Sequence, residues 1–195
     1  MRFLSAVGLI LVLSVAGAVG FAYSGLPSVA ATTDDSGPLR WLLKTTRQHS
    51  IERRAAEIVA PELSERVLVV SGATAFDEMC ARCHGAPGRD PFLGARDMNP
   101  PPPDLGEVAG KRSPSALFWM IKHGIRMTGM PAWGATHSDD QLWEMVAFIK
   151  QLPALSAADY RRLADQGTAD NHQGHHHQDH LHAVSDDVER HHHDH

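Results

Sequence analysis

Cys80-Ala81-Arg82-Cys83-His84 is the stretch of this 195-residue chain that decides its fold. Two residues separate the cysteines, so on a helix the two thiols lie about one turn apart, with an imidazole directly after them. The chain contains two cysteines, and both belong to this stretch. None remains for a disulfide or for a site built from four cysteines.

Cys-x-x-Cys-His is the attachment sequence of a c-type haem. The two thiols add to the two vinyl groups of the porphyrin, and the imidazole binds the iron. Two other interpretations fit a bare Cys-x-x-Cys. A thioredoxin-like redox pair would follow a strand, but no Val/Ile-rich strand precedes Cys80. A structural zinc site would need a second Cys or His pair at comparable spacing, which the compact part of the chain lacks. We therefore predict one covalent haem c per chain.

An iron ligand opposite the imidazole is expected from Met127-Thr128-Gly129-Met130-Pro131, a loop bounded by glycine and proline. A methionine is usually a gap-filler in a core. Haem iron, however, accepts a thioether opposite a histidine. The loop and the attachment sequence therefore support each other as parts of one haem site.

From about Leu63 to about Pro153 the chain resembles the class I c-type cytochromes. The motifs that carry this resemblance are Gly72-x-x-x-Phe76-x-x-x-Cys80, Cys80-x-x-Cys83-His84-Gly85, Pro103-Asp104-Leu105 and Gly129-Met130-Pro131-Ala132-Trp133. The resemblance implies an all-α fold wrapped around the haem.

The same resemblance implies roles for particular residues. His84 and Met130, rather than Met127, would hold the iron. The carbonyl of Pro103 would accept a hydrogen bond from Nδ1–H of His84, and Leu105 would pack on the haem. The expected cofactor-binding residues are thus Cys80, Cys83, His84, Pro103, Leu105 and Met130, and no catalytic residue is expected.

Four parts follow one another along the chain. Residues 1–24 form a membrane anchor, 25–62 a basic juxtamembrane helix, 63–155 the cytochrome domain, and 156–195 a short helix followed by a disordered His-rich tail. The run Phe3–Tyr23 is uncharged and long enough to span a bilayer. Arg2 before it favours a cytoplasmic N-terminus, hence a cytochrome domain on the periplasmic side of a bacterial cytoplasmic membrane. A signal peptide cleaved after Ser28-Val29-Ala30 is the alternative.

Helical periodicity predicts the remaining elements. A basic helix from Leu39 to Val59 either packs on the cytochrome domain or lies on an anionic bilayer or a membrane partner. Further helices are expected from about Ser64 to Glu78, from Ser113-Pro114 to Gly124, and from Ser138 to Gln151, where Ser138 and Gln141 form a capping box. Gly72 in the first of these helices suggests the close approach of the last one, and the resemblance implies that the two cross there, against Phe76 and either Trp143 or Phe148. The stretch Gly85–Gly110 has no period and is expected to be a loop.

The tail differs from the rest of the chain in charge and composition. Residues from Asp170 on carry a net charge of −5, so the remainder of the chain is neutral and is no nucleic-acid binder by charge. Ten of the 14 histidines fall between Asn171 and His195. Imidazoles suit Zn, Cu and Ni. A second, divalent-metal site is therefore a hypothesis for His172, His175, His176, His177, His180 and His182.

These patterns favour a membrane-tethered, single-electron carrier that serves redox protein partners in a respiratory or dehydrogenase chain. With His84 and Met130 on the iron, no coordination position is open for a substrate, so the chain is expected not to be an enzyme by itself, although it can be a subunit of an oxidoreductase. Two alternatives are a haem-based sensor or enzyme in which the methionine leaves the iron, and a metal-binding protein that acts through the tail.

Overall fold

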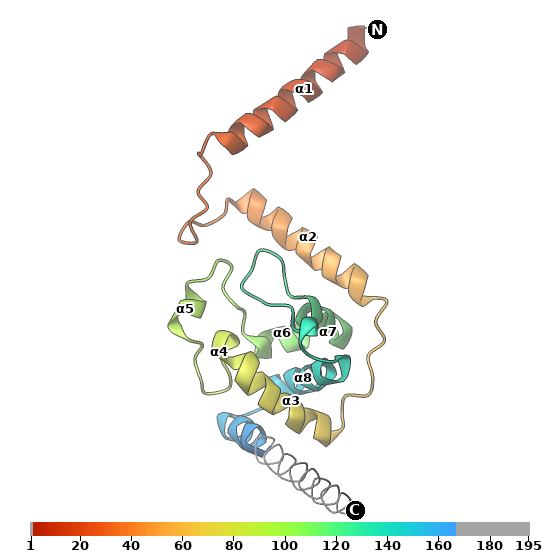
Figure 1. Ribbon diagram of the computed structural model, residues 1–195, viewed down its shortest axis with the longest axis vertical. Coiled ribbons are helices and arrows are strands. Elements are labelled where there is room, and N and C mark those ends of the chain that lie inside the picture. Colours follow the sequence, from red (N-terminus) through yellow and green to blue (C-terminus); the bar gives the residue numbers. More distant parts are fainter. Residues whose placement is uncertain (1, 167–195) are drawn as a thin grey trace, which may run out of the picture.

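The computed structural model describes residues 2–166. All regular elements among these residues are helical, which confirms the predicted all-α class. Figure 1 shows a bundle of helices with α2 (Gly37–Ala55) along one side and α1 (Arg2–Tyr23) beyond α2.

Helix α1 stands apart from the rest of the protein. Its side chains from Phe3 to Tyr23 are exposed, and in Figure 1 the helix lies beyond α2, away from the helices of the core. The hydroxyl of Ser14 donates to the carbonyl of Ile10 at 2.8 Å, so this polar group is satisfied within the helix. By length and composition, α1 can cross a membrane.

The core forms where α3 (Arg66–Met79) crosses α8 (Asp139–Gln151). A Cβ atom on Gly72 would lie 2.0 Å from the carbonyl oxygen of Glu144, so only glycine fits at the crossing. Phe76 and Phe148 are buried beside it, with ring centroids 5.1 Å apart. The predicted crossing at Gly72 is confirmed.

Helix α7 (Pro114–His123) covers another side of α8. Ser113 caps its start by accepting a hydrogen bond from the Ala116 amide at 3.2 Å, and Gly124, with φ +64°, ends it. The ring of Phe118 stacks on Trp143 of α8 with centroids 4.2 Å apart. Of the two aromatic residues proposed beside Phe76, Phe148 is therefore the partner, and Trp143 faces α7 instead.

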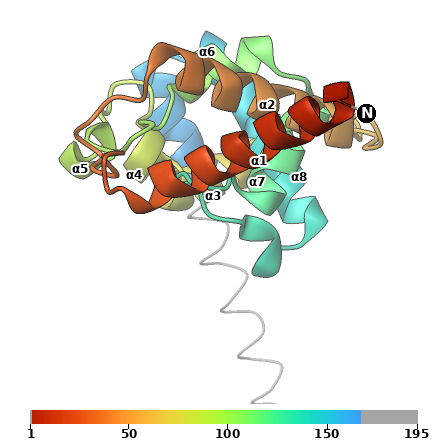
Figure 2. The same cartoon turned by 90° about the horizontal axis from the view of Figure 1, so that it is seen from above.

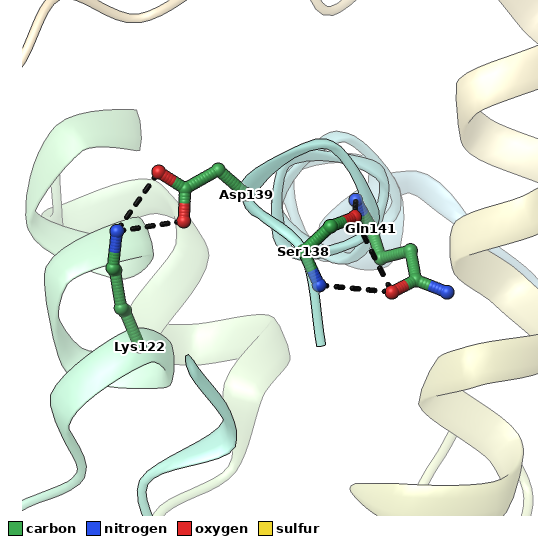
Figure 3. A network of polar contacts seen from close by, with 4 residues as sticks. All are labelled: Lys122, Ser138, Asp139 and Gln141. Atoms are coloured by element: carbon green, nitrogen blue, oxygen red, sulfur yellow. Dashed lines mark hydrogen bonds and ion pairs between the residues drawn. The ribbon is translucent and has the colours of Figure 1, made fainter. Parts of the chain in front are cut away.

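The start of α8 is fixed by two sets of polar contacts, which Figure 3 shows. Ser138 and Gln141 form the predicted capping box, in which the Gln141 amide donates to the Ser138 hydroxyl and the Ser138 amide donates to the Gln141 side chain. Next to it, Nζ of Lys122 lies 2.7 and 2.8 Å from the two carboxylate oxygens of Asp139. This ion pair joins α8 to the end of α7.

The stretch Gly85–Gly110, expected to be a loop, contains two short helices, α5 (Leu93–Arg96) and α6 (Leu105–Lys111). The carboxylate of Asp104 caps α6 by accepting from the Gly106 amide at 2.7 Å. The expectation was wrong because helices of one or two turns are too short to show a period, and the two glycines of α6 lower its helix propensity.

Only the last turns of α2 pack on the cytochrome domain. Ile51 and Ala55 are buried against Ala116 of α7, and the Ser115 hydroxyl donates to the carbonyl of Ile58 at 2.8 Å. Docking on the domain is thus confirmed for this half. The helix ends at Ala55 rather than at Val59, because the chain turns there and Ile58 leaves α2 to pack against the main core.

Residues 157–166 are helical, as predicted for the segment that Ser156 caps. The Ser156 hydroxyl accepts from the Asp159 amide at 3.2 Å. Tyr160 of this helix is buried, and its hydroxyl donates to the carboxylate of Asp77 on α3. Arg89 donates to the same carboxylate at 2.7 Å. The segment therefore closes over α3.

Candidate haem site

The attachment residues lie where α3 passes into the single-turn helix α4 (Ala81–His84). The amide of His84 donates to the carbonyl of Cys80 at 2.9 Å, which keeps Cys80, Cys83 and His84 on one continuous turn. Cys80 is buried in the main core, and Cys83 is half-buried. Burial, together with the neighbouring Cys83, raises the pKa of the Cys80 thiol well above its usual range, so this thiol is protonated at neutral pH.

His84 is oriented by a backbone carbonyl. Its Nδ1 lies 2.8 Å from the oxygen of Pro103, and since a carbonyl only accepts, Nδ1 carries the proton. Burial lowers the pKa of His84, while the Pro103 carbonyl and the charge of Asp104 act in the opposite direction. A neutral ring with its proton on Nδ1 presents the lone pair of Nε2, which is the form that binds a metal.

The structure distinguishes the two methionines of the following loop. Met127 has φ +58° and is 88% exposed, so its thioether is in solvent. Met130 instead packs against the core cluster that contains Cys80 and Ala81. Its amide donates to the Thr128 hydroxyl at 3.2 Å. Of the two, Met130 is therefore the one whose side chain packs on the core.

Glycine at the end of α7 holds this loop in place. A Cβ atom on Gly124 would lie 2.8 Å from the carbonyl oxygen of Met130 and 2.9 Å from that of Pro131. The amide of Ile125 donates to the Met130 carbonyl at 3.4 Å. The thioether is thus carried by a backbone that is fixed on both sides.

Two further residues border the same region. Leu105, the first residue of α6, is half-buried against the main core. Met98 lies beside the Met130 loop, because a Cβ atom on Gly129 would be 2.8 Å from the Met98 sulfur. Sequence reasoning missed Met98, since a lone methionine in a stretch without a period looks like any core filler.

The donor groups fit a covalent haem. Two thiols lie one turn apart, an imidazole has Nε2 left for iron, and a thioether of the fixed loop packs on the same core. A structural zinc ion would need more ligands, and no three His, Cys, Asp or Glu side chains gather for one anywhere in residues 2–166. No strand precedes Cys80 in that range either, as a thioredoxin-like pair would need.

Residues 68–149 match the family described as cytochrome c oxidase, cbb3-type, subunit III. They form a class I c-type cytochrome domain. No curated protein matches the chain, and no solved structure does. A c-type cytochrome domain carries electrons through a covalently bound haem and works between redox partners.

The second metal site predicted for the cytochrome's His-rich tail, at His172, His175, His176, His177, His180 and His182, lies outside the residues that the structure describes. His123 is described. It is an exposed residue at the end of α7, and its ring centroid lies 5.0 Å from that of Trp119.

Proposed function

We propose that this protein is a membrane-tethered, monohaem c-type cytochrome that carries single electrons on the periplasmic side of a bacterial cytoplasmic membrane. Cys80 and Cys83 would hold the porphyrin, and His84 and Met130 would be the axial ligands. The observation that carries the proposal is the 2.8 Å contact between Nδ1 of His84 and the carbonyl of Pro103, which leaves Nε2 to bind iron.

When bound, the haem supplies a reversible one-electron iron couple. The chain's own residues hold the ligands fixed. Pro103 keeps the imidazole in one tautomer, and Gly124 and Thr128 hold the backbone of Met130. Because these residues are held in place, the protein needs little structural reorganisation when the haem gains or loses one electron. If His84 and Met130 both bind the iron, they would leave no place on it for a substrate, which favours a carrier over a sensor or an enzyme.

The tether rests on α1, whose apolar surface has no contact that would bury it within residues 2–166. Exposed apolar side chains over a whole helix of this length are stable in a bilayer but not in water. The alternative, removal of the segment as a signal peptide, is tested below.

The ligand test compares two variants of the oxidised holoprotein. Thioether-to-iron ligation gives a charge-transfer band in the visible spectrum, which should vanish in Met130→Ala and persist in the matched control Met127→Leu. A band that depends on Met127 would mean that the other methionine is the ligand. A wild-type protein without any such band would favour the sensor or enzyme in which the methionine leaves the iron.

A subunit role in an oxidoreductase complex is the second candidate, and it is favoured by the family description, which names an oxidase subunit. Mild solubilisation of the membranes, followed by native electrophoresis with haem staining, tests this role. Migration with a larger complex would support it. Migration as a single small haem protein would favour a freely diffusing, tethered carrier.

A further inference from the structure

Helix α2 has an apolar stripe that the cytochrome domain does not cover. Leu39, Leu42 and Leu43 are 45–52% exposed, and their spacing of three to four residues places them on one stripe. Leu42 precedes the buried Ile51 by nine residues, which is two and a half helical turns. Leu39 and Leu43 precede Ile51 by twelve and eight residues, about a third and a quarter of a turn away from it, so the stripe lies opposite and beside the side of α2 that meets the domain.

The same helix concentrates positive charge. It carries five basic residues and one acidic residue. The chain before Asp170 has no net charge, so this helix is a local concentration of positive charge. Arg40, Lys44 and Arg47 precede Ile51 by eleven, seven and four residues, so they lie on the domain side of α2, and Arg47, four residues after Leu43, borders the leucine stripe. Lys44 and Arg47 have no carboxylate partner within ion-pair distance among residues 2–166. An arc of leucines bordered by basic residues is typical of helices that lie in a bilayer interface.

The position of α2 next to α1 indicates that the membrane crossed by α1 can cover the leucine stripe. Thirteen residues, 24–36, separate the two helices, and this length can span at most about 45 Å. The linker is held on the domain, because Nδ2 of Asn99 lies 3.2 Å from the carbonyl oxygens of both Ala31 and Thr33. Figure 1 shows α2 between α1 and the domain, and in Figure 2 both helices lie on the same face of the molecule.

We propose that α2 lies in the membrane interface, with Leu39, Leu42 and Leu43 inserted between the headgroups of anionic phospholipids and the cytochrome domain on its other side. Trp41 is 67% exposed and lies about 100° around the helix from Leu42, toward the domain side of α2. Basic side chains near the membrane surface are attracted to an anionic leaflet. The proposal rests on the proposed membrane tether. It adds a second contact, which would hold the domain in one orientation instead of leaving it on a free linker.

The test measures depth in the full-length holoprotein, reconstituted in vesicles of phosphatidylcholine with phosphatidylglycerol. Both native thiols are used in haem attachment, so a nitroxide label reacts only with an introduced cysteine. Leu42→Cys reports the stripe, and Gln48→Cys, exposed on the domain side of the same helix, is the matched control. Val12→Cys in the middle of α1 reports the tether.

In the reduced protein, the ratio of oxygen accessibility to nickel-chelate accessibility should be several-fold higher at position 42 than at position 48, and highest at position 12. Vesicles without phosphatidylglycerol should lower the ratio at position 42 and leave the ratio at position 12 unchanged.

Equal, water-like ratios at positions 42 and 48, with position 12 deep in the bilayer, would overturn the α2 proposal and keep the tether. Shielding of position 42 from both reagents would show that protein covers it, which also overturns the proposal. A water-like ratio at position 12 with a membrane-like ratio at position 42 would overturn the tether alone. Water-like ratios at both positions would overturn both proposals.

Discussion

Gly72 lets α3 and α8 come so close that a methyl group at this position would overlap the Glu144 carbonyl, at 2.0 Å. Backbone atoms cannot rotate away as side chains do, so Gly72→Ala must separate the helices on which the core rests. We expect a loss of about 1–3 kcal/mol or more in the free energy of unfolding. Circular dichroism during denaturation in detergent micelles measures it.

Gly110 provides the matched control for that prediction. It lies in α6, is exposed, and has nothing within 4 Å of the position of a Cβ atom. Gly110→Ala should therefore be neutral or should stabilise the protein by up to about 1 kcal/mol, because alanine has the higher helix propensity. Equal destabilisation by both substitutions would contradict the tight crossing.

Tyr160 makes a pH-dependent contribution to stability. Burial first, and then its hydrogen bond to Asp77, raise the pKa of the phenol well above the value of about 10 found in an unfolded chain. Below about pH 10 both states keep the proton. Above it the unfolded state loses the proton while the folded state retains it, so the free energy of unfolding falls as the pH rises.

The variant Tyr160→Phe should lose this alkaline sensitivity, and loss of the hydroxyl should cost about 1 kcal/mol at neutral pH. The measurement is urea unfolding of both proteins at about pH 8 and about pH 11, with Tyr23 present in both as a shared background. If the difference between wild type and variant stays the same at the two pH values, the phenol is not protected in the folded state.

At the scale of elements, α2 is joined to the domain through a small cluster. Ile51 is 3% exposed against α7, whereas Leu42 of the same helix is about half exposed. Truncating a buried isoleucine to alanine costs about 2–5 kcal/mol, and truncating an exposed leucine costs little. Here we expect the lost free energy to weaken the docking of α2, because α3, α7 and α8 form their core without this helix.

We therefore expect Ile51→Ala to increase amide hydrogen exchange in residues 47–55 while α3 and α8 remain protected. Leu42→Ala is the control and should leave exchange in residues 47–55 as in the wild type. Unchanged exchange in Ile51→Ala would mean that the contacts between Ser115 and Ile58 and between Arg112 and Glu52 suffice to hold the helix.

At the scale of the whole molecule, α1 is the segment on which the proposed membrane tether rests. Because its apolar side chains have no protein partner among residues 2–166, the mature protein should stay with membranes after alkaline carbonate extraction and keep its first residues. N-terminal sequencing or intact mass measures this. A soluble form that begins near Ala31 would replace the tether with a cleaved leader, and electron transfer would be unaffected.

The haem chemistry could be predicted from the sequence alone. Thiols and imidazole have to be close along the chain to bind one porphyrin, so Cys80, Cys83 and His84 form a local motif that can be read without a fold. The helices at 114–123 and 139–151 were also predictable, because their caps and apolar periods are local signals. For Gly72 the sequence indicated that something approaches closely, since glycine otherwise weakens a helix.

Tertiary structure decided the features that depend on residues distant in sequence. That Met130 rather than Met127 turns to the core follows from the end of α7 at Gly124 and from the backbone of the loop. Phe148 rather than Trp143 meets Phe76, because α7 takes Trp143 for its own packing. In α2 the leucine-rich first half stays exposed, whereas Ile51 and Ala55 of the charged second half are buried, because α7 packs against the second half. These contacts depend on which helices pack against each other. The spacing of residues along one segment does not contain that information.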